Sequence, residues 1–289
     1  MTVSKKMMAA EILEKNERLF RCPICSTDLA LVDKTRFVCQ ERHSFDLAKQ
    51  GYVNLAPQAH ETKYDKELFI ARSHVMGAGF FDPTIEFIAK AIRAKLGEKS
   101  KLTILDAGCG EGTHLMNILG ELGGVGVGVD LAKEGIMAAA KAYSGTIWTV
   151  ADLANCPFHD ARFDVILNIL SPANYAEFTR LLRPGGWIVK VVPEKRYLQE
   201  LREIFYEGKE AKEETDPVLR FSDQVTDVWA ERITYPFPLD RELLASLIRM
   251  TPLTWGASEG KVAEALESGL SSITIDYNVM IGRKREGEM

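Results

Sequence analysis

The chain has 289 residues, 46% of them hydrophobic, and a formal net charge of −5 at pH 7. A chain of this length and apolar content can bury the core of one large domain and one small one, so we expect a globular protein. The negative net charge argues against a protein that coats nucleic acid nonspecifically. No apolar run reaches the roughly 18 residues that a membrane-spanning helix needs, and the charged first residues lack a signal-peptide core. We therefore expect a cytoplasmic protein that does not enter a membrane.

The first part of the chain carries a predicted metal site. Residues 8–20 fit a short amphipathic helix, which is followed by Cys22-Pro-Ile-Cys25 and, after a stretch suited to a hairpin, by Cys39-Gln-Glu-Arg-His43. Clustered cysteines in a reducing compartment are better explained as metal ligands than as disulfide partners. Three thiolates and one imidazole complete the tetrahedron that Zn²⁺ prefers, which leaves no position for water. Cys22, Cys25, Cys39 and His43 are thus the predicted ligands of one structural zinc ion.

A polar stretch follows this module and precedes a strongly patterned segment. Residues 58–80 are polar and mixed, and they suit a linker or a lid. Asp82 then fits the N-cap of a helix with Pro83 at its first position, and Gly97 fits the end of that helix. Because its apolar positions recur on one face, we expect the helix to cover a sheet. Phe81, at the helix entrance, fits a hydrophobic staple.

The next stretch predicts a ligand-binding loop. Its sequence, Leu102-Thr-Ile-Leu-Asp-Ala-Gly-Cys-Gly-Glu-Gly112, indicates a buried strand that runs into a glycine turn and then a helix. The three glycines let the backbone turn tightly and let a ligand approach it closely. The first N–H groups of the helix suit a polar or anionic ligand. We interpret the loop as a nucleotide cradle, although its spacing departs from G-x-G-x-x-G, so an ordinary turn and an altered dinucleotide site stay open.

Two acidic residues follow later strands of the same predicted sheet. Asp130 closes the apolar run 125–129, and an acid at this place can bind ribose hydroxyls. Asp152 follows a predicted strand and fits the cap of a turn. The order of predicted elements is helix 133–143, strand 147–151, strand 163–169, helix 174–182, strand 187–192, and later strands near 228–236 and 274–283, the last of them antiparallel. This alternation predicts a doubly wound α/β fold.

Two resemblances connect these motifs to known proteins. The loop from Asp106 to Gly112, with Asp130 downstream, resembles motifs I and II of class I S-adenosylmethionine-dependent methyltransferases. The zinc ligands and the run His43–Pro57 resemble the zinc-bearing N-terminus of the RlmA family of bacterial 23S rRNA guanine-N1 methyltransferases. This resemblance covers nearly the whole chain, and its Gram-positive branch is the more similar one. The motifs that extend it are Asn54-Leu-Ala-Pro57, Ala78-Gly-Phe-Phe81, Ser171-Pro-Ala-Asn-Tyr175 and Met250-Thr-Pro252.

The resemblance implies a Rossmann-like class I methyltransferase sheet with a small N-terminal zinc-binding domain. Residues 1–58 would form the zinc-binding, RNA-recognition domain, residues 59–101 a linker and helical lead-in, and residues 102–289 the methyltransferase domain. The implied cofactor is S-adenosylmethionine, with its methionine moiety over the glycine loop and its adenine beside Asp152. Phe81 could pack against this cofactor instead of serving only as a staple. The implied cofactor-binding residues are Phe81, Asp106, Gly108, Gly110, Gly112, Thr113, His114, Asp130, Asp152 and Tyr197.

Methyl transfer to a ring nitrogen is an in-line displacement, so the protein mainly has to align the methyl donor with that nitrogen. Aminomethylating relatives carry an Asn/Asp-Pro-Pro-aromatic loop after the fourth strand, and this chain departs from that form with Ser171-Pro172-Ala173. The catalytic candidates are Asn168, Asn174 and Tyr175. The two amides could offer carbonyl oxygens to the base edge, and Tyr175 could stack on the base or merely pack.

The resemblance implies methylation of N1 of one guanine in hairpin 35 of 23S rRNA, at position 748 rather than 745. The zinc module would hold the hairpin through Lys34, Arg36 and Arg42. A cleft between the two domains, in one chain or doubled in a homodimer, would fit a folded RNA with its target base extruded. The alternative function is methyl transfer to a small metabolite or a quinone, which would use the same glycine loop but would not need a zinc module.

Overall fold

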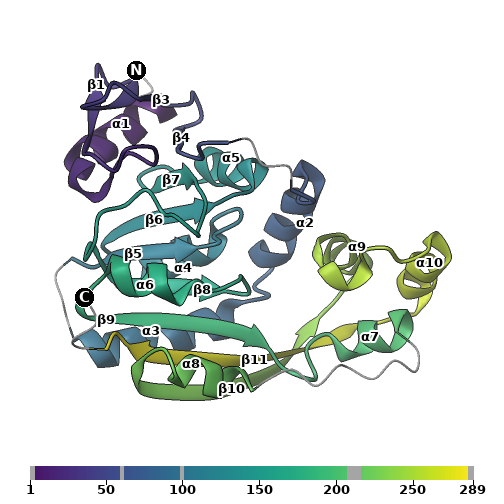
Figure 1. The fold of residues 1–289 in the computed structure, drawn as a ribbon. Coiled ribbons are helices and arrows are strands. Elements are labelled where there is room, and N and C mark those ends of the chain that lie inside the picture. Colours follow the sequence, from purple (N-terminus) through teal and green to yellow (C-terminus); the bar gives the residue numbers. More distant parts are fainter. Residues whose placement is uncertain (1–3, 59–61, 98–100, 207–215, 286–289) are drawn as a thin grey trace.

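The computed structural model describes residues 4–58, 62–97, 101–206 and 216–285. These residues form an eight-stranded sheet with helices on both faces and a separate three-stranded sheet near the N-terminus (Figure 1). The predicted α/β fold with a small N-terminal module is confirmed. Within the described ranges, no helix combines the length and the apolar character that crossing a membrane requires.

The N-terminal module consists of one helix, a short 3-10 turn and three antiparallel strands. The predicted helix at 8–20 starts earlier and ends earlier, because Ser4 caps its start and the Asn16 side chain donates a hydrogen bond to the Ile12 carbonyl at its end. The strands form the predicted hairpin between the two pairs of metal-ligand residues. The elements are α1 (Lys5–Lys15), η1 (Glu17–Leu19), β1 (Leu29–Val32), β2 (Arg36–Cys39) and β3 (Ser44–Asp46).

A short strand links this module to the large sheet. β4 (Tyr52–Asn54) pairs in parallel with β7 (Ile147–Val150) and forms an edge of the eight-stranded sheet. Tyr52 and Val53 are buried there. The first 58 residues therefore contribute to both sheets, although they were predicted as a separate domain.

The predicted linker contains a helix, α2 (Lys66–Gly77). Asp65 caps its start, with its side chain accepting a hydrogen bond of 2.8 Å from the Leu68 amide. Leu68, Phe69 and Val75 are buried against neighbouring elements. The sequence did not predict this helix, because polar residues interrupt its apolar positions. The interpretation of residues 58–80 as a linker or a lid stays a prediction. Figure 1 shows α2 beyond the arrowheads of the central strands.

The helix that follows is α3 (Asp82–Leu96), and its end at Gly97 is confirmed. Its N-cap is Phe81 and not Asp82, so the helix begins one residue earlier than predicted. Asp82 is its first residue and Pro83 its second. Proline is tolerated there because the first turn has no intrahelical partner for its N–H groups. The predicted apolar face is buried, including Ile88 and Ile92.

The strands of the large sheet run in the order β10-β11-β9-β8-β5-β6-β7-β4. The central strands are parallel, whereas β11 is antiparallel to both of its neighbours, as predicted. The strand order reverses at β5, and in open α/β sheets such a reversal marks the usual ligand-binding edge. The remaining strands are β5 (Thr103–Ala107), β6 (Val125–Asp130), β8 (Phe163–Ile169), β9 (Leu182–Pro193), β10 (Thr226–Pro238) and β11 (Ser272–Arg283).

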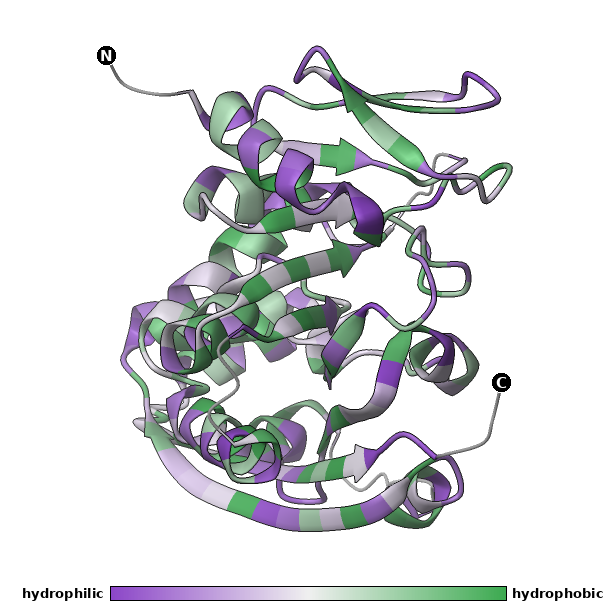
Figure 2. Ribbon diagram, turned by 90° about the vertical axis from the view of Figure 1, so that its left-hand side faces the viewer, coloured by the Kyte–Doolittle hydropathy of each residue, from purple (hydrophilic) through white to green (hydrophobic). Residues whose placement is uncertain are grey.

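Both faces of the sheet are buried. Ile104 of β5 contributes to one hydrophobic cluster and its neighbour Leu105 to another, since successive side chains point to opposite faces. Figure 2 shows hydrophobic residues concentrated in the central strands. The helices and turns that complete the fold are α4 (Thr113–Leu122), α5 (Lys133–Ala142), α6 (Tyr175–Leu181), α7 (Gln199–Phe205), α8 (Pro217–Ser222), α9 (Arg241–Met250), η2 (Pro252–Thr254) and α10 (Glu259–Glu267).

Candidate active site and metal centre

The glycine loop joins the carboxyl end of β5 to α4. Gly108, Gly110 and Gly112 have backbone φ angles of +89°, +55° and +86°, which residues other than glycine rarely adopt. A Cβ on Gly108 would lie 2.1 Å from the Ser171 hydroxyl oxygen, and one on Gly112 would lie 2.4 Å from the Trp148 ring. Glycine is therefore required at both positions by conformation and by space.

The two predicted acidic residues hold the backbone at the ends of β6 and β7. Asp130 accepts hydrogen bonds of 2.8 Å from the amides of Gly110 and Ala132, which ties the glycine loop to the next strand. Burial raises the pKa of Asp130. Asp152 accepts a bond of 2.8 Å from the Ala154 amide, so it has the turn-capping role that the sequence indicated.

A buried polar cluster lies beside the glycine loop. Asp106, Glu111 and His114 are each no more than 2% exposed. Asp106 Oδ2, Glu111 Oε1 and His114 Nδ1 are buried and have no hydrogen-bond partner among the described residues. Burial raises the pKa of Asp106 to about 8 and lowers the pKa of His114 well below its ordinary value. Buried polar atoms without partners are costly, so this cluster fits a polar ligand.

Arg72 of α2 reaches into the same cluster, and the sequence did not point to it. Its Nε donates a hydrogen bond of 2.5 Å to Glu111, and its guanidinium lies 2.9 Å from His114 Nε2. A Cβ on Gly110 would lie 3.5 Å from Arg72 and from Phe69, so α2 covers the loop. Arg72 reaches the cluster because α2 is a helix packed over the loop, and this helix was not predicted from the sequence.

Aromatic rings form one wall of the cluster. The Phe81 ring lies 4.2 Å from the His114 ring and 5.0 Å from Tyr277. Tyr197 lies 5.0 Å from the same Tyr277 ring. Thr113 Oγ1, in the first turn of α4, is 3.1 Å from the Tyr143 hydroxyl. Phe81 therefore lies against the buried polar cluster, and Tyr197 lies behind it through Tyr277. Their contact with a cofactor stays a prediction.

Asn168, the first catalytic candidate, is fully buried at the end of β8. Its amide nitrogen donates to the carbonyls of Ala107 and Pro172 at 3.0 and 3.1 Å, and its oxygen accepts from Lys190 at 2.5 Å. Lys190 also donates to the Ser171 carbonyl, and burial lowers the pKa of Lys190 to about 8. Through these contacts Asn168 holds the loop 170–174 in place. No pattern in the sequence indicated Lys190 as its partner.

The other two candidates lie at the start of α6. Asn174 is its N-cap, accepting a hydrogen bond of 3.3 Å from the Glu177 amide and donating one of 3.3 Å to the Leu153 carbonyl. The Tyr175 ring packs about 6 Å from the rings of Phe178 and Phe221. Tyr175 therefore packs against the hydrophobic layer, which is the second of the two roles expected for it.

The predicted metal ligands converge at the base of the N-terminal hairpin. One ligand atom from each of Cys22, Cys25, Cys39 and His43 lies within 4.8 Å of the other three. The Cys25 and Cys39 sulfurs are 3.6 Å apart, and His43 Nδ1 lies 3.3 Å from the Cys39 sulfur. These separations fit a tetrahedral Zn²⁺ with metal–sulfur bonds of about 2.3 Å. The His43 amide donates to the Cys39 sulfur at 3.2 Å, which supports a thiolate.

Comparison with known families decides what this arrangement is. Residues 20–63 match the profile described as "RlmA, N-terminal", and residues 104–186 match one described as "Methyltransferase domain". The chain is 42% identical over 274 residues to the Bacillus subtilis (strain 168) protein named "Putative 23S rRNA (guanine-N(1)-)-methyltransferase YxjB", across 92% of this chain and 97% of that relative. The chain belongs to the RlmA family of rRNA (guanine-N1)-methyltransferases.

Further comparisons agree with this family. The 23S rRNA (guanine(748)-N(1))-methyltransferase of Streptomyces fradiae is 29% identical over 277 residues, across 92% of this chain and 97% of that relative. The solved structure of Haemonchus contortus phosphoethanolamine N-methyltransferase 2 in complex with S-adenosyl-L-methionine matches at 17% identity with a TM-score of 0.50, across 78% of this chain and 59% of that one. This second likeness shows the fold alone, to which the RlmA chain adds its zinc module.

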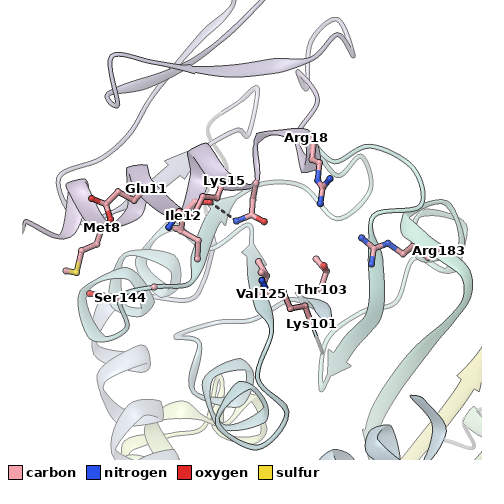
Figure 3. A pocket seen from close by; sticks show the side chains of 12 residues that line it. Met8, Glu11, Ile12, Lys15, Arg18, Lys101, Thr103, Val125, Ser144 and Arg183 are labelled. Atoms are coloured by element: carbon pink, nitrogen blue, oxygen red, sulfur yellow. Dashed lines mark hydrogen bonds between the residues drawn. The ribbon is translucent and has the colours of Figure 1, made fainter. Parts of the chain in front are cut away.

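A pocket of about 810 Å³ lies at the edge of the sheet opposite the glycine loop, where the central strands begin. It is bounded by α1 and by Thr103 and Val125, which begin β5 and β6 (Figure 3). Ligands of open α/β sheets bind at the carboxyl ends of the strands, whereas this pocket lies at their amino ends. This pocket therefore does not lie at the edge of the sheet where such folds bind their ligands.

The burial of Asp106 predicts a measurable effect of pH on stability. Its pKa is about 8 in the folded chain, against an ordinary value of 3.8 for an aspartate, so between about pH 4 and 8 the folded state binds more protons than the unfolded state. Its contribution to stability therefore falls as the pH rises through this window. Between about pH 6 and pH 8, the free energy of unfolding of the cofactor-free wild type should fall. We expect this fall to exceed that of the Asp106→Asn variant by on the order of 2 kcal/mol.

Urea unfolding of both proteins at the two pH values measures this difference. His114 and the other titrating groups are present in both proteins, so their effects cancel in the comparison. Equal losses in the wild type and in Asp106→Asn would show that Asp106 is already ionised in the folded protein.

Proposed function

We propose that this chain transfers a methyl group from S-adenosylmethionine to N1 of one guanine in hairpin 35 of 23S rRNA, at position 748 rather than 745. The observation that carries the proposal is the 42% identity to the Bacillus subtilis relative over nearly the whole of both chains. The relative from Streptomyces fradiae, whose name specifies position 748, supports the choice of guanine. The matching zinc module favours this function over methylation of a small metabolite or a quinone.

The cofactor would occupy the buried polar cluster and the glycine loop. S-adenosylmethionine supplies the methyl group on a positively charged sulfur. Gly108, Gly110 and Gly112 would lie under its methionine moiety, Asp130 would accept hydrogen bonds from its ribose hydroxyls, and Asp152 would lie near its adenine. Phe81, Asp106, Thr113, His114 and Tyr197 complete the proposed cofactor site. The unpartnered polar atoms of Asp106 and His114 support this placement.

Arg72 is proposed as a further cofactor-binding residue. The methionine moiety ends in a carboxylate, and a guanidinium binds a carboxylate with two parallel hydrogen bonds. An ion pair with Glu111 holds the Arg72 guanidinium within the buried polar cluster. It would bind that carboxylate from α2, across the glycine loop.

We propose that the loop 170–174 lines the pocket for the extruded guanine. Asn168 and Asn174 would position this loop through the contacts described above, with Lys190 anchoring the Ser171 carbonyl. Tyr175 would hold the loop on the sheet by packing beneath it. Because methyl transfer is a direct displacement, correct alignment by this rigid loop is the main catalytic contribution of the protein.

The zinc ion and the RNA contacts of the N-terminal module remain part of the proposal. One Zn²⁺ bound by the three cysteines and His43 would hold the hairpin strands in place. Arg36 and Arg42 are exposed, and Lys34 lies 3.3 Å from Glu14 across the module. These three cations would contact RNA phosphates, in one chain or in a homodimer.

Methylation of a synthetic hairpin 35 tests this function. With guanine at both positions, we expect one strong primer-extension stop, at 748, because N1 methylation blocks base pairing. Replacing G748 with adenine should abolish the stop, whereas replacing G745 should leave it. A stop that follows G745, or methylation of a metabolite extract but not of the hairpin, would contradict the proposal.

A further inference from the structure

An exposed aromatic surface lies where α2 meets the C-terminal helices. Tyr64 is 42% exposed and Trp255 is 39% exposed, although both are large aromatic residues. Their ring centroids are 5.3 Å apart with an edge-to-face arrangement. Tyr64 also lies 6.3 Å from the ring of Phe69, which is buried. Three aromatic rings from two distant parts of the chain therefore form one row, which we call the aromatic row.

The exposed end of this row opens into a pocket of about 590 Å³. Apolar side chains from α9 and α10, including Ile248 and Leu266, line it together with Trp255. Lys63 and Arg249 also line this pocket, and Arg249 is paired with Asp65 at 2.5 Å. A flat aromatic ring beside cationic groups suits a ligand that has both a planar base and a phosphate.

The buried end of the row touches the proposed active site. A Cβ on Gly110 would lie 3.5 Å from Phe69, and one on Gly135 would lie 2.7 Å from it. The row therefore runs from the glycine loop, through Phe69 and Tyr64, to the pocket at Trp255. Figure 1 shows α2 and α9 near each other on the side toward which the central strands point.

We infer that Tyr64 and Trp255 form a stacking platform for an unpaired nucleobase of the RNA substrate, next to the base that is methylated. Enzymes that act on looped RNA must hold the neighbouring unstacked bases, and aromatic side chains bind these whatever their sequence. Lys63 and Arg249 would contact the phosphates on either side of the stacked base. This inference rests on the proposed rRNA function and adds a second RNA-binding site to the one in the zinc module.

Fluorescence titration of the full-length zinc-loaded protein with hairpin 35 tests the platform. Stacking on Trp255 should quench its fluorescence, and Trp255→Phe should lose this quenching but keep most of the affinity. Trp255→Ala should weaken RNA binding about ten-fold or more, as expected for loss of one stacked base. The KM for RNA should rise with it, whereas affinity for S-adenosylhomocysteine should stay unchanged.

Trp229 provides a matched control. It is 36% exposed and its ring lies 5.0 Å from Phe87, on β10 at the other edge of the sheet from β4. Trp229→Ala should leave RNA affinity unchanged. Unchanged RNA affinity in a folded Trp255→Ala variant would overturn the platform while leaving the methyltransferase function intact. Failure of the wild type to bind or methylate the hairpin would reject both proposals. A loss of dimers in Trp255→Ala, without a change in RNA affinity, would show instead that the surface is a contact between protein chains.

Discussion

Replacing Cys39 with alanine should release the zinc ion and unfold the N-terminal module. The module has three short strands, and its buried side chains, Leu29 and Phe37 among them, belong to a cluster shared with the large sheet. The metal would close the hairpin that carries them. Structural zinc in small domains contributes on the order of 10 kcal/mol to folding. Elemental analysis should show loss of about one zinc per chain, and limited proteolysis should cleave first within residues 20–46.

Cys156 is the matched control for this variant. It is a buried cysteine outside the ligand cluster, and burial raises the pKa of its thiol to about 12, so it stays protonated. Cys156→Ala should therefore keep its zinc and its resistance to proteolysis. One zinc per chain retained in Cys39→Ala would show that the four residues are not the ligand set.

The zinc site and the order of helices and strands along the chain could be predicted because their signals are local. Metal-ligand spacing and the alternation of apolar runs depend on residues close together in sequence, and Cys22, Cys39 and the strand at 103–107 appear where they were expected. β4 could not be predicted in the same way. It has three residues, and its pairing with β7 depends on a partner far along the chain.

Only part of the buried polar cluster and its surroundings could be predicted from the sequence. The glycine loop, His114 and Asp130 follow one another in sequence within the segment β5–α4–β6. Arg72 and the aromatic row come from α2 and from residues after 250, and they reach the loop only through tertiary packing. Asn168 precedes a segment that resembles a catalytic loop. Its bond to Lys190 depends on the pairing of two strands, so the sequence alone did not indicate it.

Replacing Gly108 with valine should abolish cofactor binding. The backbone there has φ +89°, which a β-branched residue cannot adopt without strain, and even its Cβ would overlap the Ser171 hydroxyl. Either the glycine loop or the loop 170–174 must then move, and both movements disrupt the proposed site. We expect calorimetry to show at least about a 100-fold loss of affinity for S-adenosylhomocysteine, which corresponds to about 2.8 kcal/mol.

Gly120→Ala is the matched control, because Gly120 lies in α4, directly after the loop, and a Cβ there would meet nothing within 4 Å. This variant should keep the wild-type affinity and gain slightly in stability, since alanine favours helix over glycine. Zinc content separates a local effect from general misfolding: Gly108→Val should keep one zinc per chain while losing the cofactor, because the metal ligands lie in the N-terminal module. Wild-type affinity for S-adenosylhomocysteine in a folded Gly108→Val protein would remove the glycine loop from the cofactor site.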